Sequence, residues 1–156
     1  MKRYILLLFM GALLSSCMMG SYVSASLMTK EVVAQSGTKV YDAKYDDVWN
    51  AVKGILVTKG YYIAFEAKGK GIINTDQKII RSTATASTYS AQATSYYRQY
   101  KVKIKEIAEG KIQVVLDPKM YAGNNDISAK QIWVIEGEYG EKKLWNNFFN
   151  EVQELL

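Results

Sequence analysis

Apolar residues change their spacing twice along this 156-residue chain, and this change limits the fold more than any other feature. Residues 45–56 repeat large apolar side chains every three or four positions, which is typical of a helix with one buried face. Residues 96–107 and 112–116 instead alternate apolar and polar side chains, which is typical of half-buried antiparallel strands. Residues 141–156 return to the helical spacing. This order predicts an α+β fold.

Shorter apolar segments complete the expected sheet. Residues 82–95 are almost only Ser, Thr and Ala, and we expect two strand ends around a loose loop there. Pro118 should end the strand that begins at residue 112, because proline has no amide N–H to donate. Residues 131–135 can be either one more strand or the lead-in to the last helix. Further strands are expected at residues 31–34, 38–41, 61–67 and 72–81.

Each expected helix has one broad apolar face, so both should cover the same face of the sheet. The predicted architecture is therefore a two-layer α+β sandwich. The run from Tyr41 to Val52, followed by Gly60-Tyr61 and Gly71-Ile72-Ile73, resembles bacterial lipoprotein domains of helix-grip type. The best-known domains of this type belong to the accessory lipoprotein of the outer-membrane β-barrel assembly machine. The resemblance covers residues 38–80 and implies a helix-grip-like fold and an accessory or scaffold role.

The amino end has the parts of an export signal. Two basic residues precede the uncharged residues 4–14. This run is too short for a membrane-spanning helix of about 20 residues, but it fits a signal-peptide core of about 7–15. It closes with Leu14-Ser15-Ser16-Cys17, which resembles the lipobox of bacterial lipoproteins. The resemblance implies cleavage between Ser16 and Cys17 and acylation of the Cys17 thiol.

This signal sets the expected domain organisation. Residues 1–16 should be a lipoprotein signal peptide, residues 17–36 an acylated N-terminus and tether, and residues 37–156 a single α+β domain. The low charge of the tether leaves open that part of it packs on the domain. Position 18 is Met rather than Asp, so by the same resemblance an inner-membrane retention signal is absent. We therefore expect the protein to be anchored on the periplasmic side of the outer membrane or, in an organism with a single membrane, on the outer side of the cell membrane.

The residue types present argue against most catalytic and metal sites. The chain has no histidine and one cysteine, so Ser-His-Asp units, Cys-His units and ordinary zinc sites are excluded. Glu136, Glu138 and Glu141 are better explained as a solvated edge than as metal ligands or an acid/base pair. The Asn-Asn-Asp run at residues 124–126 lacks the spacing of a calcium loop. We expect no enzyme activity, no catalytic residue, no metal and no cofactor.

The candidate interaction face is the polar side of the strand at residues 96–107. Lys101, Lys103 and Lys105 should form a row there, because successive side chains of a strand point to opposite faces. Tyr97 lies on the same side of the strand. Tyrosine supplies contact area and lysine supplies charge, which suits an acidic patch on a partner or anionic lipid headgroups. A solvated sheet face that keeps the protein soluble is the alternative.

Charge and compartment limit the function. Removal of the signal peptide takes Lys2 and Arg3 from the net charge of +5, and the +3 that remains is too small to indicate nucleic acid as a partner. The sequence predicts a membrane-anchored periplasmic lipoprotein that acts as a non-catalytic binding or scaffold module for an envelope component. Its partners would be membrane lipid, through acylated Cys17, and an envelope protein. The alternative is a small-ligand carrier, or a rare enzyme, with a pocket between helix and sheet.

Overall fold

A computed structural model describes residues 25–86 and 90–156, so Cys17 and the expected signal peptide lie outside the described residues. The described part is an α+β fold with antiparallel sheets, as the sequence predicts, and it contains three α-helices. None of these helices is long and apolar enough to span a membrane. The elements are β1 (Ala25–Leu27), α2 (Lys30–Ser36), β2 (Thr38–Asp42), α3 (Tyr45–Thr58), β3 (Ile63–Ala67), the 3-10 helix η1 (Lys68–Lys70), β4 (Ile72–Thr75), β5 (Lys78–Ala86), β6 (Ala91–Ala108), β7 (Lys111–Ala122), β8 (Asn125–Asp126), β9 (Ile132–Val134) and α4 (Glu141–Glu154).

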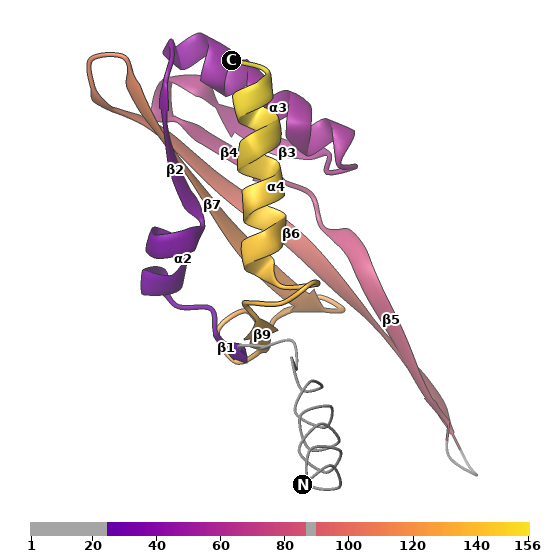
Figure 1. Cartoon of the computed structure of the whole chain (residues 1–156). Coiled ribbons are helices and arrows are strands. Elements are labelled where there is room, and N and C mark those ends of the chain that lie inside the picture. The colour runs from indigo at the N-terminus through magenta and orange to yellow at the C-terminus, as the bar shows by residue number, and fades with distance from the viewer. Residues whose placement is uncertain (1–24, 87–89) are drawn as a thin grey trace, which may run out of the picture.

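The long strand β6 organises the larger sheet, whose main strand order is β2-β7-β6-β4-β3. The first part of β6 pairs with β5, its second part pairs with β4, and β7 runs along its other edge. The β5–β6 pair extends away from the helices as a two-stranded arm (Figure 1). β1 and β9 form a separate two-stranded sheet. β6 therefore belongs both to the arm and to the sheet that carries the core.

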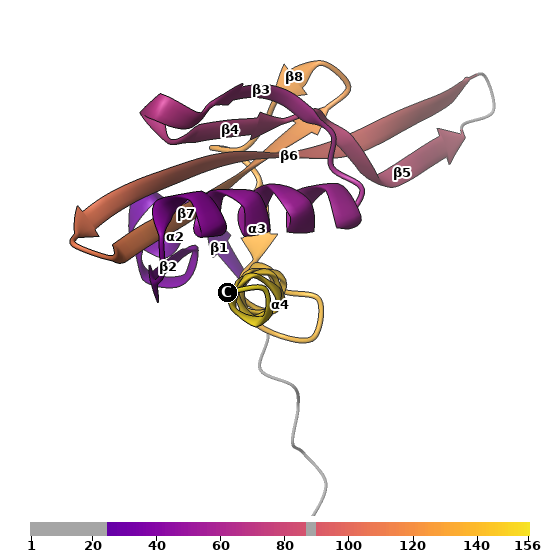
Figure 2. The same cartoon turned by 90° about the horizontal axis from the view of Figure 1, so that it is seen from above.

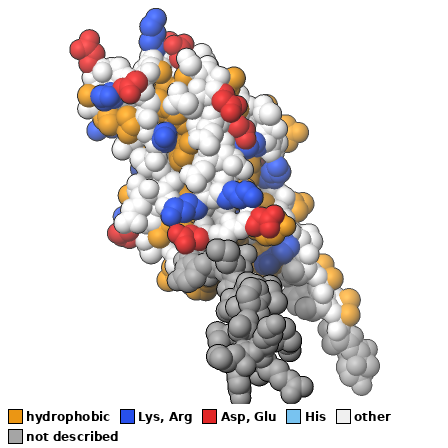
Figure 3. All heavy atoms as spheres, viewed as in Figure 1, with side chains coloured by type: hydrophobic (Ala, Val, Ile, Leu, Met, Phe, Trp, Pro, Cys, Tyr) orange, Lys and Arg blue, Asp and Glu red, His pale blue; other side chains and the backbone are white. Residues whose placement is uncertain are grey.

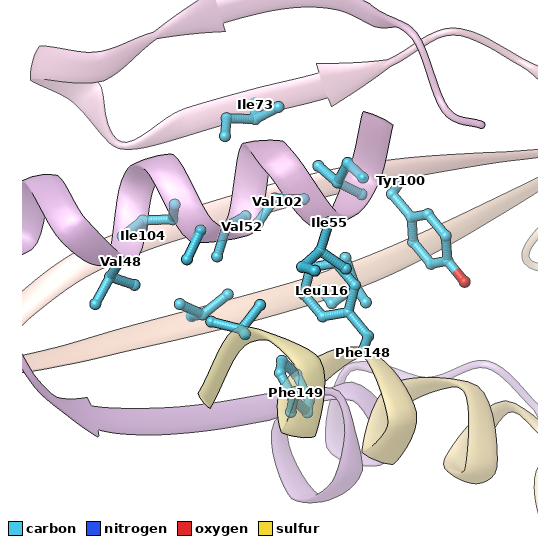
Figure 4. Packing of buried hydrophobic residues seen from close by; sticks show 14 of the residues in the cluster. Val48, Val52, Ile55, Ile73, Tyr100, Val102, Ile104, Leu116, Phe148 and Phe149 are labelled. Carbon is cyan, nitrogen blue, oxygen red and sulfur yellow. The ribbon is translucent and has the colours of Figure 1, made fainter. Parts of the chain in front are cut away.

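The two long helices, α3 and α4, lie on the same side of this sheet (Figure 2). Their apolar faces meet the inward side chains of the central strands, as the alternating pattern predicts (Figure 4). The Tyr41 hydroxyl of β2 donates a hydrogen bond to the Phe149 carbonyl oxygen of α4 at 3.0 Å, which ties the edge strand to this helix. The buried set includes Val48, Val52, Leu56, Val102, Ile104, Val114, Leu116, Trp145, Phe148 and Val152.

The segment before residue 37 corrects one prediction. A strand at residues 31–34 is wrong, because this part of the chain is the helix α2. The Thr29 hydroxyl oxygen accepts a hydrogen bond from the Val32 N–H at 3.3 Å and so satisfies an amide that the first helical turn leaves free. Val33 is buried in the main core, and β1 pairs with β9. Residues 25–36 therefore pack on the domain, which is the arrangement that their low charge left open.

The prediction that Pro118 ends its strand is also wrong, because β7 continues to Ala122. The Leu116 N–H donates to the Gly37 carbonyl oxygen at 2.7 Å, on the side of β2. Amide directions along a strand repeat every two residues, so the position of the missing Pro118 N–H faces the same side. β2 begins at Thr38, so Pro118 lies beyond the stretch that pairs with β2. A proline is tolerated at such an edge position.

The single strand expected at residues 72–81 is divided into β4 and β5. Thr75 holds the junction, because its buried hydroxyl accepts from the Tyr100 N–H at 3.0 Å and donates to the Asp76 carbonyl oxygen at 3.0 Å. The Ser/Thr/Ala segment forms the expected strand ends, since β5 reaches Ala86 and β6 starts at Ala91. The loop expected between them falls largely on residues 87–89, outside the described residues.

Helix α4 buries Trp145, Phe148, Phe149 and Val152 of its expected apolar stripe, but not the leucines of that stripe. Leu144 is 37% exposed, Leu155 is 60% exposed and Leu156 is 40% exposed, although all three were expected in the apolar stripe. Glu141, expected at a solvated edge, is only 3% exposed. It lies in the first turn of α4 and makes an ion pair with Arg98 of β6. The expectation of a solvated Glu141 is therefore wrong, because the fold brings a cation from a distant strand against it.

Candidate binding face

β6 presents Lys101, Lys103 and Lys105 on the sheet face opposite α3 and α4. The alternation that buries Val102 and Ile104 leaves the three lysines exposed. Residues two positions apart along a strand are about 7 Å apart, so the three lysine side chains leave β6 in an evenly spaced row. The row runs along the middle of the sheet, because β6 has β7 on one edge and β4 on the other.

A hollow of about 550 Å³ lies beside this row, where α2 and the residues before it border the open face of β6 and β7. Its floor includes apolar side chains, and its rim carries lysines from three parts of the chain. Apolar surface surrounded by cations suits a partner group that combines a negative charge with an apolar body. The lining includes Lys30, Val33, Lys101, Lys103, Val115 and Lys119.

The positive charge of this face is only partly compensated. The carboxylate of Asp117, which also lines the hollow, is 2.9 Å from the Lys119 ammonium. Within the described residues, Lys101, Lys103 and Lys105 make no ion pair shorter than 4.0 Å. Three of the lysines on this face are therefore available to a negatively charged partner.

A second carboxylate marks one border of the face. The Ser128 N–H donates to Asp126 Oδ1 at 2.8 Å. Hydrogen bonds from the side chain and amide of Ser128 hold the pKa of Asp126 below its ordinary value, and the charges of Lys119 and Lys101 act in the same direction. Asp126 is therefore ionised at neutral pH and limits the positive field near β8.

The other two candidate residues flank the hollow without lining it. Lys105 lies opposite Gln113, a residue of the hollow. Tyr97 is half-buried at the base of the arm, in register with Ile79 on one side and Tyr121 on the other. The predicted set is therefore divided. Lys101 and Lys103 line the hollow, while Lys105 and Tyr97 extend the same face at its two ends.

Two further lysines of the hollow were missed at the level of sequence. Lys119 was placed beyond the strand, because Pro118 was expected to end it, and Lys30 was placed in the tether. The signal for Lys119 is present, since residues 113, 115, 117 and 119 continue the alternation of β7 through the proline. Lys30 has no such signal, because its position depends on where α2 packs against the sheet.

The helix side of the molecule carries charges of both signs. Figure 3, which views the side covered by α4, shows basic and acidic side chains interspersed. Several of these lysines have acidic partners. Lys59 pairs with Glu151 at 2.6 Å, and Lys142 pairs with Glu136 at 3.1 Å. Lys101, Lys103 and Lys105 of β6 have no such partner within the described residues, and they differ from other unpaired lysines in lying next to one another on one strand.

The described residues contain no group of three or more Asp, Glu, Cys or His side chains close enough to hold a metal ion. Glu136, named above as a conceivable ligand, is paired with Lys142, and Glu141 is paired with Arg98. The hollow on the open face is lined by lysine ammonium groups, apolar side chains, the Asp117 carboxylate and the neutral polar side chains of Thr29, Thr38 and Gln113.

Comparisons with known proteins assign no family to this chain. No protein-family model matches the sequence, and no curated protein matches it. Among solved structures, the chain is similar to the crystal structure of a DUF4468 family protein from Bacteroides ovatus ATCC 8483. The TM-score is 0.43 at 11% sequence identity, and the match covers 76% of this chain and 83% of that chain. A similarity of this size assigns neither family nor activity.

Proposed function

We propose that this protein is a membrane-anchored periplasmic lipoprotein that acts as a non-catalytic binding module for an acidic component of the cell envelope. The observation that carries the proposal is the row of unpaired lysines beside a 550 Å³ hollow, on the sheet face opposite the two long helices. The lipobox at Leu14-Ser15-Ser16-Cys17 supports the lipid anchor. The location that follows is the periplasmic side of the outer membrane, where the module would serve as an accessory or scaffold component.

We also propose that the fold is a two-layer arrangement of helix-grip type. Two observations support it: α3 and α4 share one core with the inner face of the sheet, and they lie on the same side of it (Figure 2). In such an arrangement the helices supply stability and the opposite sheet face is free for binding. The row of three neighbouring lysines on β6 lies on that opposite face.

The shape of the hollow favours a protein partner over a lipid surface. A bilayer presents its headgroups over a broad, nearly flat surface. Here Lys101, Lys103 and Lys119 surround a concave site that α2 borders. A protruding acidic side chain next to an apolar one fits that site, with its carboxylate against the lysines and its neighbour against Val33 and Val115. The proposed partner is therefore an envelope protein with an acidic, partly apolar projection.

The anchor is tested by Cys17→Ala. The variant should lose acylation and should not be cut by the lipoprotein peptidase, because the thiol is the only acceptor of its kind in the chain. Labelled fatty acid should enter the wild type and not the variant, and the variant should run at the size of the uncleaved chain. A variant that still incorporates label and matures normally would show that Leu14-Ser15-Ser16-Cys17 is not a lipobox.

The binding face is tested by Lys101→Glu combined with Lys103→Glu and Lys105→Glu. Reversing three exposed and unpaired charges should leave the fold intact and weaken partner binding by about tenfold or more at low ionic strength. Wild-type binding should itself weaken at high salt, because exposed charges are screened over about 10 Å at 0.1 M. The measurement is recovery of the partner from solubilised envelopes at two salt concentrations, with a melting curve of each variant.

The matched control is Lys44→Glu combined with Lys130→Glu and Lys143→Glu, which changes the net charge by the same amount. These lysines are exposed, lie outside the hollow and make no ion pair within the described residues. The control should retain partner recovery. Equal losses in both triple variants would indicate a general charge effect, and full recovery with the β6 variant would place the interaction elsewhere.

A further inference from the structure

A second cavity, of about 280 Å³, lies between α3, α4 and the helix-covered face of the sheet, near the base of the arm. It is separate from the lysine-rimmed hollow and shares no lining residue with it. Leu56, Leu116 and Phe148 form an apolar wall, and Tyr100 is at one end of the core cluster next to them (Figure 4). Polar and charged side chains complete the lining. A cavity with this combination has the properties of a small-molecule site.

Two tyrosines place hydroxyl groups among these side chains. The Tyr61 and Tyr100 rings meet edge to face, with their centroids 4.9 Å apart, and the Lys78 ammonium lies 5.0 Å from the Tyr61 centroid. Burial raises the pKa of Tyr61 and raises that of Tyr100 well above its ordinary value. Both hydroxyls therefore keep their protons at neutral pH and remain hydrogen-bond donors.

The lining of this cavity has a surplus of positive charge. Lys59, Lys78 and Arg98 contribute to it, and no carboxylate does. Lys59 is paired with Glu151 and Arg98 with Glu141, both of which lie outside the lining. Lys78 has no acidic partner within 4.0 Å in the described part of the chain, and its ammonium donates to the Lys59 carbonyl oxygen instead. One cation is therefore left over beside the apolar wall.

The buried guanidinium is also incompletely satisfied. The Nε atom of Arg98 is buried and has no hydrogen-bond partner among the described residues. A buried donor without a partner is costly, and such groups are rare in folded proteins. The Oε2 atom of its partner Glu141 is buried without a hydrogen-bond partner as well, so these two atoms are able to satisfy each other. A ligand carboxylate near Arg98 and Lys78 would instead compensate the charge of Lys78, which no carboxylate of the described residues pairs with.

We propose that this cavity binds a small organic carboxylate with an apolar body, the carboxylate at Arg98 and Lys78 and the body against the apolar wall. A single negative charge matches the one unpaired cation, whereas a dianion would exceed it. The two tyrosine hydroxyls share a hydrogen bond with each other, so one of them remains as a neutral donor for the site. This site is independent of the function proposed for the open sheet face, because the two share no residue.

The test uses benzoate as the probe, with benzamide as its neutral counterpart and inorganic phosphate as an anion without an apolar body. The protein purified from its host in detergent micelles is titrated by calorimetry against a protein-free micelle blank. Benzoate should bind saturably and about tenfold more tightly than benzamide, because hydrogen bonds to charged groups are among the stronger ones. Equal affinity for benzamide, stronger binding of phosphate, or no saturable binding of benzoate would overturn the proposal.

Two variants locate the site, and one serves as the control. Leu144→Trp places a larger side chain at the partly exposed edge of the cavity and should abolish benzoate binding. Lys78→Met removes the unpaired cation and should weaken binding by about fivefold or more. Lys143→Met removes an adjacent exposed charge of α4 that does not line the cavity and should change nothing. Unchanged affinity in both folded site variants, checked by melting curves, would contradict the assignment.

Discussion

Replacing Trp145 with alanine is expected to lower the free energy of unfolding by about 3–5 kcal/mol, the usual loss for a buried tryptophan. Trp145 is fully buried in the core that α4 shares with the sheet. It also packs closely on the turn before β2, since a side chain added at Gly37 would lie 3.2 Å from its indole Cε2 atom. The indole is too large for its neighbours to fill the gap, so the loss combines lost apolar burial with a cavity.

Urea denaturation of the wild type and the Trp145→Ala variant measures this loss, which is a large part of the roughly 5–15 kcal/mol that stabilises a typical domain. Leu144→Ala is the matched control, because it is the neighbouring residue of α4 and is 37% exposed. Its expected loss is below about 1 kcal/mol. Similar losses in the two variants would mean that α4 does not face the sheet as described.

Replacing Glu141 with alanine is expected to cost about 3–5 kcal/mol, the range measured when one partner of a buried ion pair is removed. Glu141 and Arg98 expose only 3% and 13% of their side chains, so the remaining guanidinium would be left charged in a poorly solvated site. Combining Glu141→Leu with Arg98→Met should restore much of the loss, because the charge and its partner leave together. Thermal melting of the wild type and the two variants measures this difference, and a double variant no better than Glu141→Ala would contradict it.

The same pair gives a pH dependence with a defined sign. Burial raises the pKa of Glu141 from its ordinary 4.5, although the Arg98 charge and hydrogen bond act against that rise. The folded protein then holds this proton more tightly than the unfolded chain does. As the pH rises from 4.5 through the raised pKa, the wild type should lose stability relative to Glu141→Gln, which has no such group. An opposite slope in the stability difference would show that the pairing outweighs burial.

The parts of the fold that follow from the sequence are those where one local pattern decides the outcome. The alternation of Tyr100, Val102 and Ile104 with lysines determines which side of β6 is buried, and the structure agrees. The helical spacing at residues 45–56 likewise predicts the buried face of α3. Elements that depend on distant contacts are not predictable in this way. The burial of Glu141 requires Arg98, which is 43 positions away in the chain.

The candidate site is likewise predictable only where a local pattern decides the outcome. The lysine row needs only the alternation of one strand, so its members were found from the sequence. The hollow beside it needs α2 to lie against the sheet and β7 to continue past Pro118. The local sequence instead predicted a strand where α2 lies, and it predicted that β7 ends at Pro118. The cation surplus of the second cavity was missed because Lys78 and Arg98 meet only through the pairing of β5 with β6.

The central claim, that the open face of β6 is the binding face, is tested most directly inside the intact envelope. A photo-reactive amino acid is placed at Lys103 in the hollow and, in a second strain, at Lys143 on the exposed side of α4. Irradiation should link position 103 to one envelope protein through a peptide rich in Asp or Glu, and reversal of Lys101 and Lys105 to Glu should remove that product. A product from position 143 with none from position 103 would contradict a binding role of the open face of β6.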